Sequence, residues 1–317
     1  MILRGLRHAL PVNARANVVT VVRCSVVACS GVVSGYRAWS RRVAVGVVLV
    51  LVAAGCSDSD DSASAPGTSA DNASTSTTVA APTGPLVRTG EDRLPPLWVQ
   101  GVARIPGGWI FSGTNSLWRT GDDLAEITHT GPSIPKAWAA KGFNHVGDID
   151  VVGRYIYAPL EQPEYEKGRQ ATARFDRDTL RFVDAVTVEQ HENSFVTVDP
   201  ETMTAYSMDR FDGDALTRYD VNDGWKPLAP LKLSRLLHRT QGADVYGGAV
   251  WISTDDAQHG VYRVDAKTGA VTRVARMGHP GGEGEGIDAT ETPSGFLHTL
   301  CVDAKLVPVW FGHFASE

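Results

Sequence analysis

The sequence predicts an all-β fold, a β-propeller, and two observations lead to this prediction. A pattern of short strands recurs five times, and its copies begin at Gln100, Gly147, Asn193, Gln241 and Glu285. These starts lie 47, 46, 48 and 44 residues apart. Four short strands in about 45 residues, repeated without a helical pattern of comparable length, are typical of propeller blades.

The second copy shows the plan of one blade most clearly. Its first strand has the sequence G-D-I-D-V-V from Gly147, and Gly153-Arg154 form a tight turn. The segment Y-I-Y-A-P-L-E follows as a second strand that ends on Glu161. β-Branched and aromatic residues with alternating polarity favour strands at both segments.

Five copies predict five blades, with a degenerate sixth blade as the alternative. The fifth copy ends at Glu317 before its own outer strand is complete. The segment 86–97 precedes the first copy. We therefore expect this segment to supply the outer strand of the last blade and so to close the ring.

Residues 1–55 are predicted to be a signal peptide, either as a genuine long leader or with translation beginning nearer Val32 or Val33. Arg41-Arg42 precede thirteen residues of apolar or small type, and Cys56 follows them. This arrangement, with Ala53-Ala54-Gly55-Cys56 at its end, resembles the signal of bacterial lipoproteins. The resemblance implies a palmitate-type lipid on Cys56 and a place on the outer, extracytoplasmic face of the cell membrane. The alternative is an uncleaved membrane anchor, but thirteen residues fall short of the ~20 that a spanning helix needs.

Residues 56–85 are predicted to be a disordered tether, and residues 86–317 the propeller domain. The tether is rich in Ser, Thr, Ala and Asp and contains no aromatic residue, so it cannot bury a core. The four cysteines include only Cys301 within the propeller, so no disulfide framework is expected there.

The charge of the chain argues against nucleic-acid binding. Residues 1–55 contain seven Arg and no acidic residue, which leaves 23 basic against 36 acidic residues in the rest. Phosphate neutralisation by Lys and Arg supplies most of the affinity for nucleic acids, and this domain has an acidic surplus. The surplus is compatible with cations, sugars or protein partners.

The starts of the first strands are where we expect chemistry, because in a propeller they converge on the central axis. Oxygen ligands gathered there suit Ca²⁺, and the candidate metal ligands are Asp148, Asn193, Gln241 and Glu285. His145 and Glu285 are the candidate catalytic residues, as a general base or acid. Glu161 is not expected near the channel mouth. A cluster of His145 with His191, His238 and His279 is a further hypothesis, although no metal-binding spacing supports it.

A structural role is the alternative for the acidic residues that repeat. Asp150, Asp244 and Asp288 occupy one equivalent position in three copies. We interpret these three as bridges between adjacent blades, since Asp side chains accept hydrogen bonds from strand backbones.

The repeat from Gln100 to Val309 resembles extracellular bacterial propellers of the YncE-like and SMP-30/gluconolactonase-like groups. The resemblance implies a fold more than an activity. In the lactonase group, Glu, Asn and Asp hold calcium, and Glu285, Asn193 and Asp148 match these ligands in type.

Two functions follow as hypotheses. The first is a lipid-anchored propeller that binds an envelope protein, a glycan or a small molecule, with a structural calcium ion on its axis. The alternative is a calcium-dependent hydrolase of lactones, phosphoesters or glycosides, with its site at the channel mouth.

Overall fold

The computed structural model describes residues 81–163, 169–279, 281–303 and 307–317. Cys56 and the predicted signal peptide lie outside these residues. Within the described part of the chain, no helix is long and apolar enough to cross a membrane.

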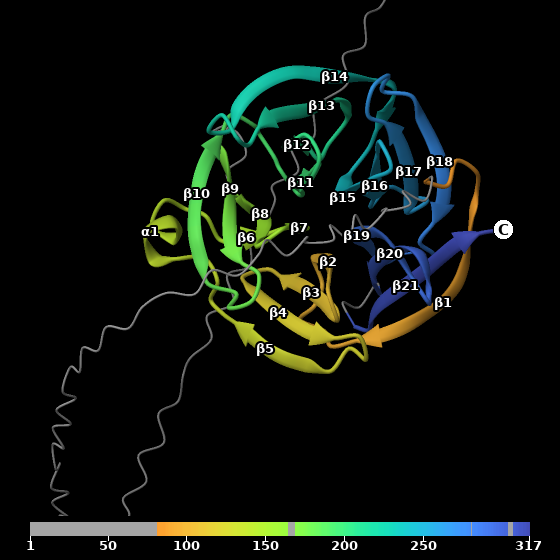
Figure 1. The fold of residues 1–317 in the computed structure, drawn as a ribbon, viewed down its shortest axis with the longest axis horizontal. Coiled ribbons are helices and arrows are strands. Elements are labelled where there is room, and N and C mark those ends of the chain that lie inside the picture. The colour runs from red at the N-terminus through yellow and green to blue at the C-terminus, as the bar shows by residue number, and fades with distance from the viewer. Residues whose placement is uncertain (1–80, 164–168, 280, 304–306) are drawn as a thin grey trace, which may run out of the picture. The chain divides into compact units, whose positions relative to one another are not determined.

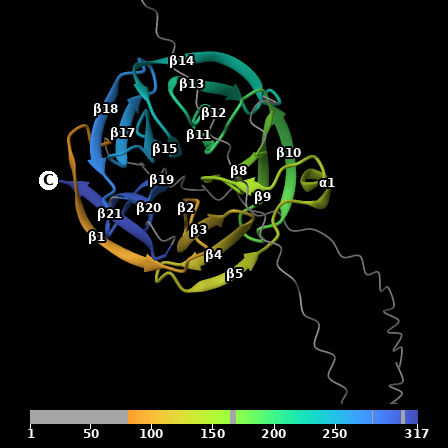
Figure 2. The same cartoon turned by 180° about the vertical axis from the view of Figure 1, so that it is seen from behind.

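The described residues form a five-bladed β-propeller (Figure 1). Figure 2 shows the same ring of sheets from behind, with one short helix, α1 (Lys136–Ala139), outside it.

Blade 1 contains β2 (Gly101–Ile105), β3 (Gly108–Gly113), β4 (Ser116–Gly121) and β5 (Glu126–Thr130). Blade 2 contains β6 (His145–Val146), β7 (Asp150–Val152), β8 (Tyr155–Glu161), β9 (Gln170–Asp176) and β10 (Phe182–Val188). Blade 3 contains β11 (Thr197–Val198), β12 (Thr204–Ser207), β13 (Gly213–Asp220) and β14 (Lys226–Leu237). Blade 4 contains β15 (Thr240–Tyr246), β16 (Ala249–Thr254), β17 (Gly260–Asp265) and β18 (Val271–Arg276). Blade 5 contains β19 (Glu283–Thr292), β20 (Gly295–Val302), β21 (Val309–Ser316) and β1 (Leu86–Leu94).

The ring closes through the N-terminal strand, as the sequence predicts. β1 pairs antiparallel with β21, from Leu86 opposite Ser316 to Leu94 opposite Val309. Strands from the two ends of the domain therefore share one sheet, and β1 forms its outer edge (Figure 1). This arrangement confirms five blades and excludes the sixth.

The hydrophobic core is divided among the five interfaces between adjacent blades. One cluster, for example, joins Ile110 and Leu117 of blade 1 to Ile149, Ile156 and Phe175 of blade 2. Each cluster of buried residues combines side chains from two neighbouring sheets in this way. Burial of apolar area at these interfaces drives the packing of the blades around the axis.

The inner strands of blades 2 and 3 are shorter than the sequence predicts. The first strand of blade 2 is divided into β6 and β7, and in blade 3 only Thr197–Val198 form β11. A side chain at Gly147 would meet the carbonyl oxygen of Ser194 at 2.1 Å, so the two inner chains approach very closely. Asp148 makes an isolated parallel bridge to Phe195 at this place. At this close approach, residues 147–149 do not pair with β8, so the first strand of blade 2 is interrupted there.

Candidate active site at the mouth of the axis

Asp148 lies on the propeller axis and joins three other blades. Its Oδ1 accepts a hydrogen bond from Val102 N at 3.1 Å, and its Oδ2 accepts from Ala243 N at 3.0 Å and Ile287 N at 3.3 Å. Burial raises the pKa of Asp148 well above its ordinary value, and these backbone N–H groups oppose the shift. The carboxylate is therefore occupied by backbone donors from blades 1, 4 and 5.

Glycines make room for this carboxylate. The repeat position that holds Asp148 in blade 2 holds Gly101, Gly242 and Gly286 in the three blades that Asp148 contacts. A Cβ atom built on any of these glycines would approach a carboxylate oxygen of Asp148 to 2.7 Å or less. One acidic side chain in a ring of glycines thus fills the centre of the fold.

The repeated aspartates link neighbouring blades, which confirms their predicted structural role. Asp150 Oδ2 accepts from Val198 N at 2.7 Å, Asp244 Oδ2 from Ala289 N at 2.7 Å, and Asp288 Oδ2 from Arg104 N at 2.7 Å. Each bond runs from one inner strand to the inner strand of the next blade. Burial raises the pKa of Asp150 to about 6 and that of Asp288 to about 7, and it raises the pKa of Asp244 as well.

A polar cavity of about 280 Å³ opens at the mouth of the axis, on the face where the first strands begin. Its lining comes from all five blades and consists of Gln100, Asn144, His145, Gly147, Glu161, Gln162, Pro163, Ser194, Arg210, Gln241, Glu283 and Glu285. The sequence-predicted residues His145, Gln241 and Glu285 meet here. This volume lies just below the ~300–1,000 Å³ range of ligand sites.

Glu161 and His145 are two neighbouring titratable residues in this cavity. They lie opposite each other in the pairing of β6 with β8, and His145 Nε2 is 3.9 Å from Glu161 Oε2. The same ring nitrogen is 2.8 Å from Gln100 Oε1. Burial raises the pKa of Glu161 to about 7, against the opposing charge of Arg210. Burial and the Arg210 charge lower the pKa of His145 to about 4.

The shifted pKa values allow a protonated carboxyl group and a neutral imidazole to stand side by side. Glu161 holds its proton up to about pH 7, whereas the His145 imidazole is neutral above about pH 4. Two titratable neighbours whose pKa values are displaced in opposite directions are typical of an acid and a base with separate roles. The expectation that Glu161 lies away from the channel mouth is wrong. The second strand returns to the face where the first strand starts, so its last residue reaches the cavity.

Glu283 and Glu285 of blade 5 add two carboxyl groups to the cavity lining. Burial raises the pKa of Glu285 well above its ordinary value, and the charge of Glu283 raises it further. The carbonyl oxygen of Glu285 accepts a hydrogen bond from the Ser253 hydroxyl, which fixes the start of β19 against blade 4. Three carboxyl groups therefore line a cavity whose cationic side chain is Arg210.

Arg210 lines the cavity although the sequence gave no reason to place it there. It follows β12, and its carbonyl oxygen accepts a hydrogen bond from Thr240 N at 3.0 Å, which anchors the loop to blade 4. Its Nε is buried and has no hydrogen-bond partner among the described residues. The Arg210 side chain lines the cavity, and a guanidinium group is suited to hold a carbonyl or carboxylate oxygen. The signal available in the sequence was its position shortly after a second strand, β12. Glu161 has a similar position as the last residue of the second strand β8.

The four predicted metal ligands do not form one coordination group. Asp148 accepts backbone hydrogen bonds on the axis, and Asn193 is fully buried, with its Nδ2 donating to Ala171 O at 2.9 Å. Gln241 and Glu285 line the cavity. Within the described residues, no three His, Cys, Asp or Glu side chains are arranged to hold a metal ion. A calcium site on the axis stays a prediction.

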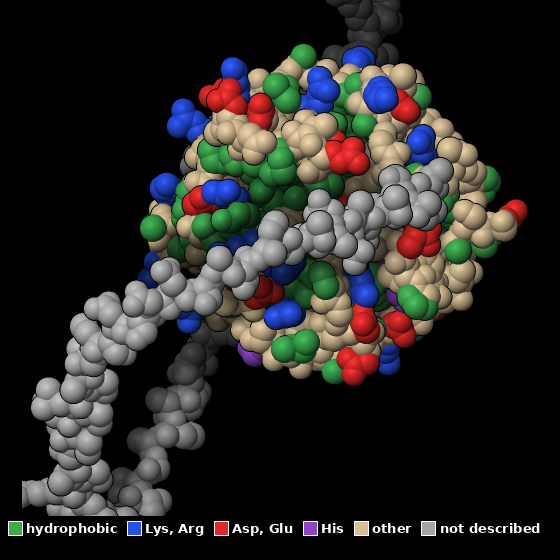
Figure 3. Space-filling view, in the orientation of Figure 1, with side chains coloured by type: hydrophobic (Ala, Val, Ile, Leu, Met, Phe, Trp, Pro, Cys, Tyr) green, Lys and Arg blue, Asp and Glu red, His purple; other side chains and the backbone are tan. Residues whose placement is uncertain are grey.

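The predicted histidine cluster does not form. His145 lies in the cavity, whereas His238 pairs with Asp212 and His279 with Glu91 on separate parts of the surface. On the face seen in Figure 3, Lys and Arg side chains lie beside Asp and Glu side chains rather than forming a field of one sign.

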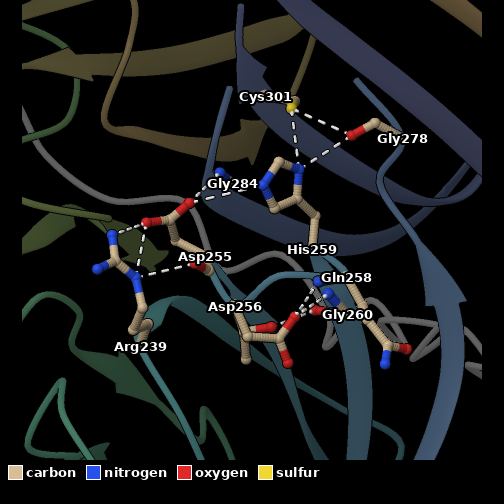
Figure 4. A network of polar contacts seen from close by, with 10 residues as sticks. Arg239, Asp255, Asp256, Gln258, His259, Gly260, Gly278, Gly284 and Cys301 are labelled. Atoms are coloured by element: carbon tan, nitrogen blue, oxygen red, sulfur yellow. Dashed lines mark hydrogen bonds and ion pairs between the residues drawn. The ribbon is translucent and has the colours of Figure 1, made fainter. Parts of the chain in front are cut away.

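A buried network supports the strand that carries Glu283 and Glu285 (Figure 4). Asp255 follows β16; its Oδ2 pairs with Arg239, and its Oδ1 accepts from Gly284 N at 3.2 Å. His259 Nε2 lies 3.7 Å from the same Oδ1. The network thereby ties the start of β19 to blade 4.

Cys301 lies beside this network as a buried thiol. Its Sγ is 3.9 Å from His259 Nδ1 and 3.6 Å from Gly278 O (Figure 4). Burial raises the pKa of Cys301 to about 12, so the group is a thiol at neutral pH. Reactive cysteines instead have lowered pKa values and are partly exposed.

Comparison with known proteins supports the fold alone. No family model and no curated protein sequence matches the chain. Among solved structures, glutaminyl cyclase of Myxococcus xanthus superimposes with a TM-score of 0.51 at 13% identity, covering 72% of this chain and 96% of that chain. Hydrazine synthase of Kuenenia stuttgartiensis gives a TM-score of 0.40 at 12% identity, over 66% of this chain and 57% of that chain. At such identities, a shared propeller architecture does not establish a shared activity.

Proposed function

We propose that the axial cavity is the active site of an enzyme that uses acid–base chemistry on a small substrate with an amino group. One observation carries the proposal: Glu161, with a pKa of about 7, lies 3.9 Å from a neutral His145 inside one small polar cavity. Perturbed titratable groups that share a cavity are a mark of functional sites.

The charges of the cavity indicate the chemistry of the substrate. Glu283 and Glu285 suit the amino group, and the guanidinium group of Arg210 suits a carbonyl or carboxylate oxygen. Gln100 and Gln241 add carboxamide groups that both donate and accept. These features together fit an amino acid amide or the amino-terminal residue of a peptide.

The reaction to test first is ring closure of an amino-terminal glutamine. The structural likeness to a glutaminyl cyclase suggests this reaction, because that name denotes cyclisation of a glutaminyl residue. The α-amino nitrogen, as the free amine, attacks the side-chain amide carbon, the bond from that carbon to the amide nitrogen breaks, and ammonia leaves. Neutral His145 accepts the proton of the attacking amine, and protonated Glu161 donates its proton to the departing nitrogen. Transfer of the proton from His145 to Glu161 restores both groups.

The test is an assay of the full chain with glutaminyl dipeptide amides, in which released ammonia and the cyclised product are measured. We expect turnover by the wild type and a loss of about 100-fold or more in Glu161→Gln, because general acid catalysis typically contributes this much. Glu291→Gln is the matched control, since Glu291 is exposed on the same strand as Glu285. Equal rates in Glu161→Gln and wild type would refute the role of Glu161. Binding without turnover would favour the non-catalytic role, with an envelope protein, glycan or small molecule as the partner.

We propose that the enzyme acts at the outer face of the cell membrane, held by a lipid on Cys56. The sequence Ala53-Ala54-Gly55-Cys56 supports this anchoring. Cys56→Ser should abolish incorporation of labelled palmitate and move the protein from the membrane fraction to the soluble fraction. Unchanged fractionation would contradict the anchor.

A calcium ion on the axis, and with it a calcium-dependent hydrolase, is a separate prediction. Metal analysis of the purified chain tests it directly, together with the melting temperature with and without chelator. A ligand that binds only the native state stabilises it by mass action, so loss of a bound ion would lower the melting temperature. An unchanged melting temperature in metal-free protein would refute this prediction.

A further inference from the structure

A second cavity opens beside the axial one and differs from it in chemistry. It has a volume of about 410 Å³ and shares Gln100, Glu283 and Glu285 with the axial cavity. Beyond these shared residues its wall is largely apolar, formed by Pro96, Leu97, Val99, Trp118 and Val302, with Thr114, Asn115 and Ser116 completing it. We call this space the apolar annex.

The wall of the annex is built on packed structure. Trp98 N donates to Pro95 O at 3.1 Å, which closes a turn around Pro96 and Leu97. The Trp98 ring stacks on Phe111 at 4.8 Å between ring centroids. A Cβ atom at Gly113 would lie 2.3 Å from the Leu97 carbonyl oxygen, so the turn rests directly on β3. The annex therefore exists before a ligand arrives.

Leu97 presents an unused apolar surface at this place. It is 67% exposed, although it lies in the wall of a cavity and beside the charged residues of the axial site. A single exposed leucine is common on protein surfaces. Here, however, the side chain faces a space that continues into a polar cavity, so a ligand with a polar head and an apolar arm would cover it.

We propose that the annex is the subsite for an apolar side chain on the second residue of a peptide whose amino-terminal residue occupies the axial cavity. This inference rests on the proposed function and specifies its substrate. The two residues are neighbours in the peptide, and the two cavities are neighbours through Gln100, Glu283 and Glu285. Glu283 at the boundary would repel an acidic second residue. The expected order of preference is therefore leucine, then glycine, then aspartate.

The experiment measures binding and turnover of three peptide amides, Gln-Leu, Gln-Gly and Gln-Asp, by the full chain. Burial of part of a leucine side chain gives roughly a tenfold preference for Gln-Leu over Gln-Gly in binding and in kcat/KM. Leu97→Ser should reduce this preference to about threefold or less, and Leu97→Met should restore most of it, because the change conserves apolar volume. Leu236→Ser is the matched control, since Leu236 is 39% exposed on the outer strand β14 and lines neither cavity.

A fourth probe, 3-methylbutanamide, separates the annex from the catalytic proposal. It carries the apolar arm without an amino terminus, and its binding is followed by ligand-detected NMR. Equal affinity for Gln-Leu and Gln-Gly, with turnover of both, would overturn the annex and leave the proposed function intact. Binding of 3-methylbutanamide that depends on Leu97, without turnover of any peptide, would support the apolar subsite and refute the cyclisation. Failure of all four probes to bind would overturn both.

Discussion

Two carboxyl groups of this propeller, Asp148 and Glu161, are both buried but are used in opposite ways. Asp148 accepts three backbone hydrogen bonds from three blades, whereas Glu161 accepts one long bond, of 3.4 Å, from Asn193 N and lines a cavity. Burial raises the pKa of both groups. A raised pKa alone therefore does not identify a functional acid. The hydrogen-bond partners decide whether the group supports the fold or faces a ligand.

The strongest test of this contrast is Asp148→Ala. The change leaves the N–H groups of Val102, Ala243 and Ile287 buried without their acceptor. Each buried unpaired group costs about 1–3 kcal/mol, so we expect a loss of at least about 3 kcal/mol in the free energy of unfolding. Urea denaturation followed by tryptophan fluorescence measures this loss, with Glu291→Gln as the control. A variant as stable as wild type would show that Asp148 does not hold the blades together.

The second test concerns the cavity, through the pH dependence of kcat. His145 must be neutral to accept a proton, and Glu161 must be protonated to donate one. The attacking amine must also be free, and an α-amino group has a pKa of about 7.7–8.0. The rate should therefore be highest at about pH 7–8, fall above this range as Glu161, with a pKa of about 7, loses its proton, and fall below it as the amine is protonated. In Glu161→Gln the residual activity should lose its decline above this range. A decline that persists in this variant would assign it to another group.

The sequence predicted the architecture because a propeller repeats its local pattern. Five starts at similar spacing gave the five blades, and the incomplete fifth copy indicated the closing strand. The repeat also gave the interblade role of Asp150, Asp244 and Asp288, since an equivalent residue in equivalent surroundings makes an equivalent bond. Local periodicity was sufficient for these features.

The site was only partly predictable, because it depends on which chain segments converge on the axis. His145, Gln241 and Glu285 were found from their place at the starts of first strands. Glu161 and Arg210 were missed because they lie at the ends of second strands, which return to the same face. The role of Asp148 depends on three glycines in other blades, and their distance from its carboxylate is a property of the assembled ring.

A third test uses the stability of the whole fold against pH. Burial raises the pKa of Asp150, Glu161 and Asp288 to about 6, 7 and 7, above the value of about 4 in the unfolded chain. These groups bind more protons when folded, so their stabilisation is present below about pH 4 and is lost as the pH rises through 6 and 7.

His145 and His298 act in the opposite direction, because burial lowers their pKa values to about 4 and about 3. The buried carboxyl groups outnumber them, so we expect a melting temperature several degrees lower at pH 8 than at pH 5. Calorimetry at both pH values measures the difference, and Glu161→Gln should reduce it. A higher melting temperature at pH 8 would contradict the inferred protonation of these groups.

The smallest expected effect comes from the space around Asp148. A Cβ atom in Gly242→Ala would lie 2.4 Å from Asp148 Oδ2 and 2.8 Å from the Cα of Gly286, so the axis must widen or the carboxylate must move. Overpacking of this kind typically costs about 1–3 kcal/mol, which urea denaturation can resolve. Gly84→Ala is the matched control, since a Cβ atom there meets nothing within 4 Å. If Gly242→Ala retains full stability, the carboxylate has freedom to move on the axis. In that case, only Asp148→Ala would test whether Asp148 is a fixed interior acid, in contrast to Glu161 at the mouth of the axis.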